Sequence, residues 1–247
     1  MANWNDPQPT QAGFGASSRL DGRTIGRAGY DAGLRRHMLS IYNYMASGVL
    51  LSGIVALMFA MSGMAAQVMA TPLRWVIALA PLGFVFAMSF GVHKMKTSTL
   101  QLLFWLFSVA MGLSLSAIFL VYTGPSIATT FFATAAAFAG LSLVGYTTKK
   151  DLSAMGTFLI MGVIGILVAM VINIFLQSNG LALAISALGV LIFAGLTAWD
   201  TQRLKNEYQM LAGTEFAGKA VVMGALSLYL DFINMFQFLL AFLGDRR

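Results

Sequence analysis

Seven long apolar segments, separated by short polar stretches, make up most of the chain after residue 37. They cover residues 38–62, 73–92, 99–122, 126–147, 154–177, 181–202 and 218–243. Each is long enough to cross a bilayer as a helix, which takes about 20 residues. Because backbone polar groups in hydrocarbon must be satisfied within the segment, the pattern predicts an all-α membrane protein with seven transmembrane helices. Residues 1–36 are polar, so we expect a disordered cytoplasmic tail there and a seven-span membrane domain over 37–247.

The composition supports a protein that lies in a membrane. Of the 247 residues, 58% are hydrophobic and only 10% are charged, whereas soluble domains carry roughly 25% charged residues. The chain has no cysteine, which excludes disulfides and thiol catalysis. It has no phosphate-binding loop, and two separated histidines make no metal cage, so we expect no cofactor. The lipid bilayer is the expected partner, and nucleic acid is not.

Lysine and arginine are divided unequally between the two sides of the predicted bundle. With seven spans, 12 of these 15 residues lie on the side of the N-terminus and 3 on the other side. Since cytoplasmic loops are rich in Lys and Arg, we expect a multi-pass protein of the inner membrane with a cytoplasmic N-terminus. A re-entrant last segment would instead return the C-terminus to the cytoplasm. The 12 are Arg19, Arg23, Arg27, Arg35, Arg36, Lys94, Lys96, Lys149, Lys150, Arg203, Lys205 and Lys219.

Two of the nine acidic residues lie within or at the edge of an apolar segment. Asp200 stands at the end of the sixth segment, in "GLTAWDTQRLK", and Asp231 stands inside the seventh, in "SLYLDFINMF". An aspartate at the centre of a membrane helix costs roughly 2.5–3.5 kcal/mol. Arg203, three residues after Asp200, could form a local ion pair. Asp231 has no basic residue within ten positions, and Asn234 on its face cannot neutralise it.

The hypothesis that explains both residues is a carboxylate pair across adjacent antiparallel helices. Two carboxylates within hydrogen-bonding reach tend to share one proton. Such a pair can sense protons, and when both members are ionised it can bind a divalent cation such as Ca²⁺ transiently. Asp231 lies deeper than Asp200, so the two meet only if the sixth helix continues past the membrane edge or the seventh begins higher. Arg203 and Glu207, four residues apart in "DTQRLKNE", favour a continued helix.

Several motifs together resemble the Bax inhibitor/YccA-like family, also called the transmembrane Bax-inhibitor-motif family, in a bacterial form. They are "DAGLRRHMLSIYNYMASGV" (31–49), "GYTTKKDLSAMG" (145–156), "VINIFL" (171–176), "AWDTQRLK" (198–205) and "ALSLYLDFINMF" (225–236). The resemblance implies seven helices with the last one central. It also implies a pH-sensitive Ca²⁺ leak whose two gating aspartates are hydrogen-bonded when closed and separate when deprotonated. By motif position these are Asp200 and Asp231.

The resemblance also implies supporting residues around the pair. Some family members carry a basic residue at the end of the second span that contacts the aspartates, and His93 or Lys94 stands there in this chain. We expect Arg203 and Asn234 to support the pair from its own helices. Some bacterial relatives are thought to modulate a membrane-bound ATP-dependent protease, which implies an alternative, regulatory function through the N-terminal tail.

An enzyme is the remaining class with a similar constellation. Intramembrane aspartyl proteases also place two aspartates on neighbouring spans, with a Gly-x-Gly-Asp signature and a Pro-Ala-Leu motif. Here "LYL" precedes Asp231, and no "PAL" occurs. The sequence therefore predicts a protein that is not an enzyme. The expected function is a cation leak, with Ca²⁺ as the permeant ion and protons as the regulator.

Overall fold

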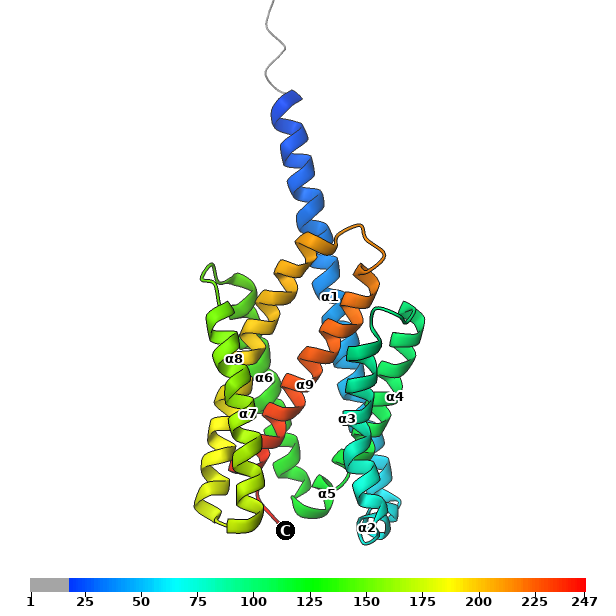
Figure 1. Ribbon diagram of the computed structural model, residues 1–247, viewed down its shortest axis with the longest axis vertical. Helices are drawn as coiled ribbons and strands as arrows, with labels where there is room; N and C mark the ends of the chain where they lie inside the picture. The colour runs from blue at the N-terminus through cyan, green and yellow to red at the C-terminus, as the bar shows by residue number, and fades with distance from the viewer. Residues whose placement is uncertain (1–17) are drawn as a thin grey trace, which may run out of the picture.

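The computed structural model describes residues 18–247, with side chains from residue 30 onward. Nine helices form within this part of the chain (Figure 1). Seven of them are long and apolar enough to cross a membrane, which confirms the predicted number of spans. The helices are α1 (Ser18–Met61), α2 (Met64–Met69), α3 (Leu73–Gly91), α4 (Thr97–Leu115), α5 (Ile118–Val121), α6 (Gly124–Thr147), α7 (Ser153–Leu176), α8 (Asn179–Leu211) and α9 (Ala217–Leu243).

The first helix begins much earlier than the apolar pattern indicates. Residues 18–36 form its first turns, where the sequence predicts a disordered tail, and these turns project beyond the bundle (Figure 1). Extending a helix that already exists adds one hydrogen bond per ordered residue, so continuation is easier than nucleation. Near residue 30 the helix gains tertiary contacts, because Tyr30 and His37 pack against the Tyr208 ring. The tail prediction for residues 1–17 lies outside the described residues.

The sixth span also exceeds its predicted end at residue 202. Helix α8 continues to Leu211, nine residues or roughly 14 Å further. Its extension is stabilised by the contact of Tyr208 with α1 and by the ion pair between Arg203 and Glu207. This continuation is the condition under which Asp200 and Asp231 were expected to meet.

The last helix is the centre of the bundle, as the family resemblance implied. Helix α9 packs against α1, α4, α6 and α8, and half of its most apolar window is buried inside the protein. Tyr229 at its middle is fully buried against Phe107, with ring centroids 5.0 Å apart. The Tyr229 hydroxyl lies 2.6 Å from Ser52 Oγ, and Ser52 in turn donates to the Ser108 carbonyl. These polar groups are therefore satisfied within the bundle.

The C-terminus lies at the end of the bundle away from the start of α1 (Figure 1). Beyond α9, the Arg247 N–H donates to the Val121 carbonyl, and the Asp245 carbonyl accepts from the Thr123 N–H. Helix α9 thus runs the full height of the bundle and is not re-entrant. The α3–α4 loop with Lys94, the α6–α7 loop with Lys149 and the start of α9 with Lys219 all lie near the end from which α1 projects. We call this the basic end and the other the opposite end.

Candidate functional site: an aspartate pair between α8 and α9

The structure brings Asp200 and Asp231 together from neighbouring helices. Asp200 belongs to α8 and Asp231 to α9, and only 6% and 5% of their surfaces are exposed. Their carboxyl groups lie close enough for the charge of each to act on the other. A hydrogen bond between two carboxyl groups requires that one of them carries the proton. The arrangement therefore suits a pair that shares a single proton.

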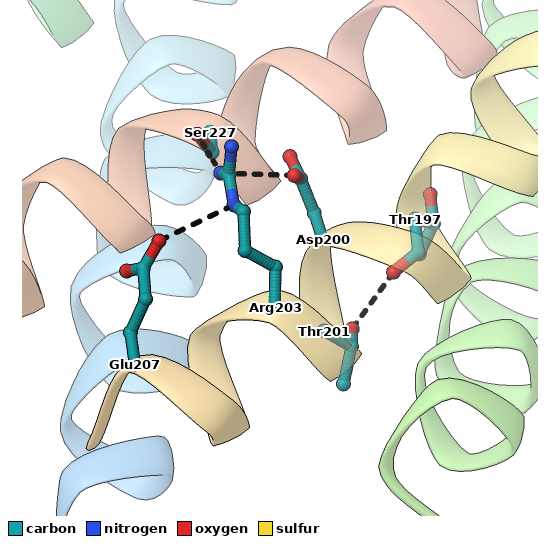
Figure 2. A network of polar contacts seen from close by, with 6 residues as sticks. All are labelled: Thr197, Asp200, Thr201, Arg203, Glu207 and Ser227. Atoms are coloured by element: carbon teal, nitrogen blue, oxygen red, sulfur yellow. Dashed lines mark hydrogen bonds and ion pairs between the residues drawn. The ribbon is translucent and has the colours of Figure 1, made fainter. Parts of the chain in front are cut away.

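Arg203 is the cation of this site (Figure 2). Its Nη2 atom lies 2.9 Å from Asp200 Oδ1 and donates to Ser227 Oγ on α9 at 3.1 Å. Its Nε atom lies 3.6 Å from Glu207 Oε1, and its guanidinium lies over the Trp199 ring at 4.9 Å from the centroid. One side chain thus connects both helices at the level of the pair. The ion pair at i, i+3 is the local one that the sequence suggested.

The charges of the site balance only with a proton present. Two ionised carboxylates beside Arg203 leave a net charge of −1, whereas a pair that shares one proton leaves a net charge of zero. Glu207 also approaches Arg203, but its side chain is 36% exposed and is screened by solvent. Asp231 Oδ2 is buried and has no hydrogen-bond partner among the described residues. A fully ionised pair would therefore be poorly compensated in its buried setting.

Two of the expected supporting residues lie elsewhere, which corrects the sequence interpretation. The His93 ring stacks on Phe216 with centroids 5.7 Å apart. Lys94 lines a separate cavity of about 660 Å³ near the start of α9, together with Lys219. The physical reason is that α3 packs mainly on α4 and not on α8. The residues that follow α3 therefore meet the α8–α9 loop, where Lys94 and Thr214 line the same cavity. The basic group at the pair comes from α8 instead.

Asn234 does not bond to Asp231 in this structure. Its Nδ2 atom donates to the Leu230 carbonyl of its own helix at 2.8 Å. Its side chain also lines a cavity that continues toward the opposite end of the bundle. Asn234 therefore lies one turn below Asp231 but makes no direct contact that would support the pair.

Polar residues that follow Asp200 anchor α8 to the rest of the bundle. Gln202 bridges the α6–α7 loop, because its Oε1 accepts from the Leu152 N–H at 2.8 Å and its Nε2 donates to the Lys150 carbonyl at 2.7 Å. Lys205 Nζ donates to the Tyr146 carbonyl at 2.7 Å. Sequence reasoning missed these roles. The run of polar residues after Asp200 is visible in the sequence. Which element each of these side chains meets depends on how α8 is rotated against the helices around it.

A chain of hydroxyl groups links the same segment to α6 and α1. Thr201 donates to the Thr197 carbonyl within α8 (Figure 2), and its Oγ1 atom lies 2.9 Å from Ser142 Oγ on α6. Ser142 also hydrogen-bonds to the Tyr42 hydroxyl on α1. Three helices are thus tied together next to Asp200.

The site does not have the composition of a permanent metal centre. Within the described residues, no group of three or more His, Asp or Glu side chains could hold a metal ion. Resident Ca²⁺ takes six to eight oxygen ligands, and here two carboxylates face one another beside a guanidinium.

Fold and site together define a multi-pass α-helical membrane protein with a buried carboxylate pair beside its central helix. The chain belongs to the Bax inhibitor family: the family model described as "Inhibitor of apoptosis-promoting Bax1" matches residues 34–247. It is 43% identical to the inner membrane protein YbhL of Escherichia coli, over 87% of this chain and 94% of that protein. An uncharacterized protein of Caulobacter vibrioides is 49% identical, over 88% and 91% of the two chains. The protein RP147 of Rickettsia prowazekii is 43% identical, over 88% and 93%.

Proposed function

We propose that this protein is a pH-sensitive cation leak of the inner membrane, with Ca²⁺ as the permeant ion. The observation that carries the proposal is the contact between Asp200 and Asp231, two buried carboxyl groups that share one compensating guanidinium. Intramembrane acidic residues mark ion and proton pathways in general. The inner-membrane location follows the printed name of the Escherichia coli relative, and the excess of basic residues at one end supports a cytoplasmic position for that end.

The proposed gate works through the charge of the pair. With one proton shared, the carboxyl groups hold α8 and α9 together and the path is shut. Loss of that proton leaves two like charges in contact, with only Arg203 to compensate them. The charges repel or recruit a cation, and α9 shifts relative to α8. The proton biases the two states because it binds the closed state more tightly.

The sign of the pH dependence follows from this scheme. Low pH favours the shared proton and the shut state, whereas high pH favours the ionised, open state. Ca²⁺ flux is therefore expected to increase from about pH 6 to about pH 8.

The test is Ca²⁺ entry into proteoliposomes that contain the purified protein and an enclosed fluorescent indicator. Flux is measured at about pH 6 and about pH 8 for the wild type, Asp231→Asn and Asp200→Asn. Both substitutions keep the shape of the side chain and remove its titration. Asp151→Asn is the matched control, because Asp151 lies in the exposed α6–α7 loop and caps the Ser153 N–H.

The proposal holds if wild-type flux increases with pH, either aspartate variant flattens this dependence, and Asp151→Asn retains it. It fails if no protein-dependent flux is seen at either pH. In that case the regulatory alternative gains weight, since the first turns of α1 project from the bundle and offer a surface to a membrane-bound protease. Crosslinking through this projecting helix would then identify the partner.

A further inference from the structure

Polar side chains form a stripe along one face of α9. Ser227, Asp231, Asn234 and Gln237 follow one another at spacings of four, three and three residues, and residues three or four apart share one face of a helix. Ser227 and Asp231 belong to the gate described above. Asn234 and Gln237 continue the stripe toward the opposite end, where the proposed gate gives them no role.

A cavity of about 450 Å³ receives the lower half of this stripe. It lies between α7, α8 and α9, and its walls are mainly apolar. Four polar side chains face it: Asn173 from α7, Ser186 from α8, and Asn234 and Gln237 from α9. The deepest of these, Asn234, stands three residues or roughly 4.5 Å along the helix axis from Asp231. The cavity thus ends one helical turn from the aspartate pair.

Two of these polar side chains are paired within the protein, because Asn173 Oδ1 accepts from the Ser178 N–H at 3.1 Å and Ser186 Oγ donates to the Ala182 carbonyl at 2.8 Å. The other two are incompletely paired. Gln237 is exposed, and its side chain forms no hydrogen bond with any residue that the structure describes. Asn234 uses its Nδ2 atom on the Leu230 carbonyl, which leaves its Oδ1 oxygen as an acceptor toward the cavity. An amide group in hydrocarbon without a partner costs several kcal/mol. Water in the cavity would remove this cost.

We propose that this cavity is a water-filled vestibule that leads a cation from the opposite end of the bundle to the aspartate pair. Asn173, Ser186, Asn234 and Gln237 supply oxygen atoms that replace part of the hydration shell of the ion, as uncharged carbonyl and amide groups do in channels. The absence of charge in the vestibule suits conduction, because a passing ion must also leave. This inference rests on the proposed function and adds the route by which the ion reaches the gate.

The natural absence of cysteine allows a direct test in the full chain. Single cysteines are introduced as Asn234→Cys and Gln237→Cys, with Leu188→Cys as the control. Leu188 is 54% exposed on the outer face of α8. It stands nine residues after the start of α8, and Asn234 stands nine residues before the end of α9, so both are at a similar distance from the opposite end. Membrane vesicles of both orientations are treated with a membrane-impermeant, positively charged methanethiosulfonate reagent. Modification is measured as a mass increase of the purified protein.

A water-filled vestibule predicts that Asn234→Cys and Gln237→Cys react at least about tenfold faster than Leu188→Cys, because the thiolate that reacts forms only in a hydrated site. The reaction is expected only in vesicles that expose the opposite end. Equal rates at all three positions would overturn the vestibule, whether or not the protein conducts Ca²⁺. Disulfide crosslinks between two copies at Gln237→Cys would overturn it as well, because a second copy would then fill the cavity.

A flux measurement separates the vestibule from the gate. Asn234→Leu and Gln237→Leu together should reduce Ca²⁺ flux severalfold at both pH values, while the ratio between the two pH values is preserved. Asp231→Asn should change that ratio. Rapid modification of Asn234→Cys without any Ca²⁺ flux would contradict the proposed leak and leave a hydrated cavity. Flux that is unchanged by the two leucine substitutions would contradict the proposed route and leave the gate intact.

Discussion

In helices α7 and α9 the more apolar helix is the less buried one, which is opposite to the rule for soluble proteins. Helix α7 is the most apolar of the seven spans, yet only 11% of its most apolar window is buried in the protein. Helix α9 is the least apolar span, and 50% of its window is buried. In water the most apolar elements occupy the interior. Here the bilayer is the solvent, so α7 faces lipid and the polar groups of α9 are placed where the protein can pair or hydrate them.

The comparison shows what holds this bundle together. Lipid tails are as apolar as leucine, so burial of apolar area in the protein provides little driving force between membrane helices. Close packing and hydrogen bonds between helices take its place. In α9 these are the Tyr229 contact to Ser52 and the Arg203 contact to Ser227. In α7 the side chains of the outer face meet only lipid, so their identity matters little beyond being apolar.

The largest expected effect comes from removing the same side chain in the two regions. Leu228→Ala in α9 should destabilise the protein by about 3 kcal/mol, because Leu228 is fully buried and its removal leaves a cavity. Leu176→Ala in α7 should change stability by less than about 0.5 kcal/mol, because Leu176 is 62% exposed and lipid fills the space. Thermal unfolding of both variants in the same detergent checks the difference. Equal losses would show that α7 is packed against a partner that the isolated chain lacks.

A second effect concerns glycines, which allow helices to approach closely. A Cβ atom added at Gly145 in α6 would collide with the Ala198 carbonyl oxygen of α8, and backbone cannot move aside as a side chain can. Gly145→Ala should therefore cost about 2 kcal/mol. Gly165→Ala in α7 has open space around it and should stabilise the helix by up to about 1 kcal/mol. The melting temperatures should move in opposite directions, and a shift in the same direction would contradict the packing of α6 on α8.

Features set by the chain's own composition were predictable from the sequence. The seven spans followed from segment length and hydropathy, which require no knowledge of tertiary contacts. The pair was suggested by the lack of a local partner for Asp231. The continuation of α8 to Leu211 was suggested by the spacing of Arg203 and Glu207. In each case the signal lies within one segment or in a charge that has no other explanation.

Features set by the rotation of one helix against another were not predictable in the same way. The choice between Lys94 and Arg203 as the cation of the pair depends on where the end of α3 points, and this is decided by its packing on α4. The contact of Ser227 with Arg203 depends on the depth at which α9 passes α8. The spacing of Ser227 and Asp231 showed that they share a helix face, but it did not show which helix lies opposite.

Removal of the cation at the pair should have a smaller effect on stability and a clear effect on pH dependence. Arg203→Gln should cost about 1 kcal/mol, since the side chain is 36% exposed and the pair can compensate by keeping its protons. The loss of a positive charge disfavours ionised carboxylates, so Ca²⁺ flux should begin at a higher pH than in the wild type. Arg203→Lys keeps the charge and should retain most of the wild-type profile. A profile unchanged in Arg203→Gln would show that Arg203 does not influence the gate.

The smallest effect is expected at the outer edge of the same network. Glu207 approaches Arg203 at 3.6 Å, but both side chains are 36% exposed, and ion pairs in such positions contribute roughly 0–1 kcal/mol. Glu207→Gln should therefore lower stability by about 0.3 kcal/mol and leave the pH dependence of flux unchanged within error. The comparison with Arg203→Gln tests where the buried site ends, because the two residues touch and differ mainly in their contact with Asp200. If Glu207→Gln shifted the pH profile as strongly as Arg203→Gln, the gate would include three carboxylates, and the neutral state would require a second proton.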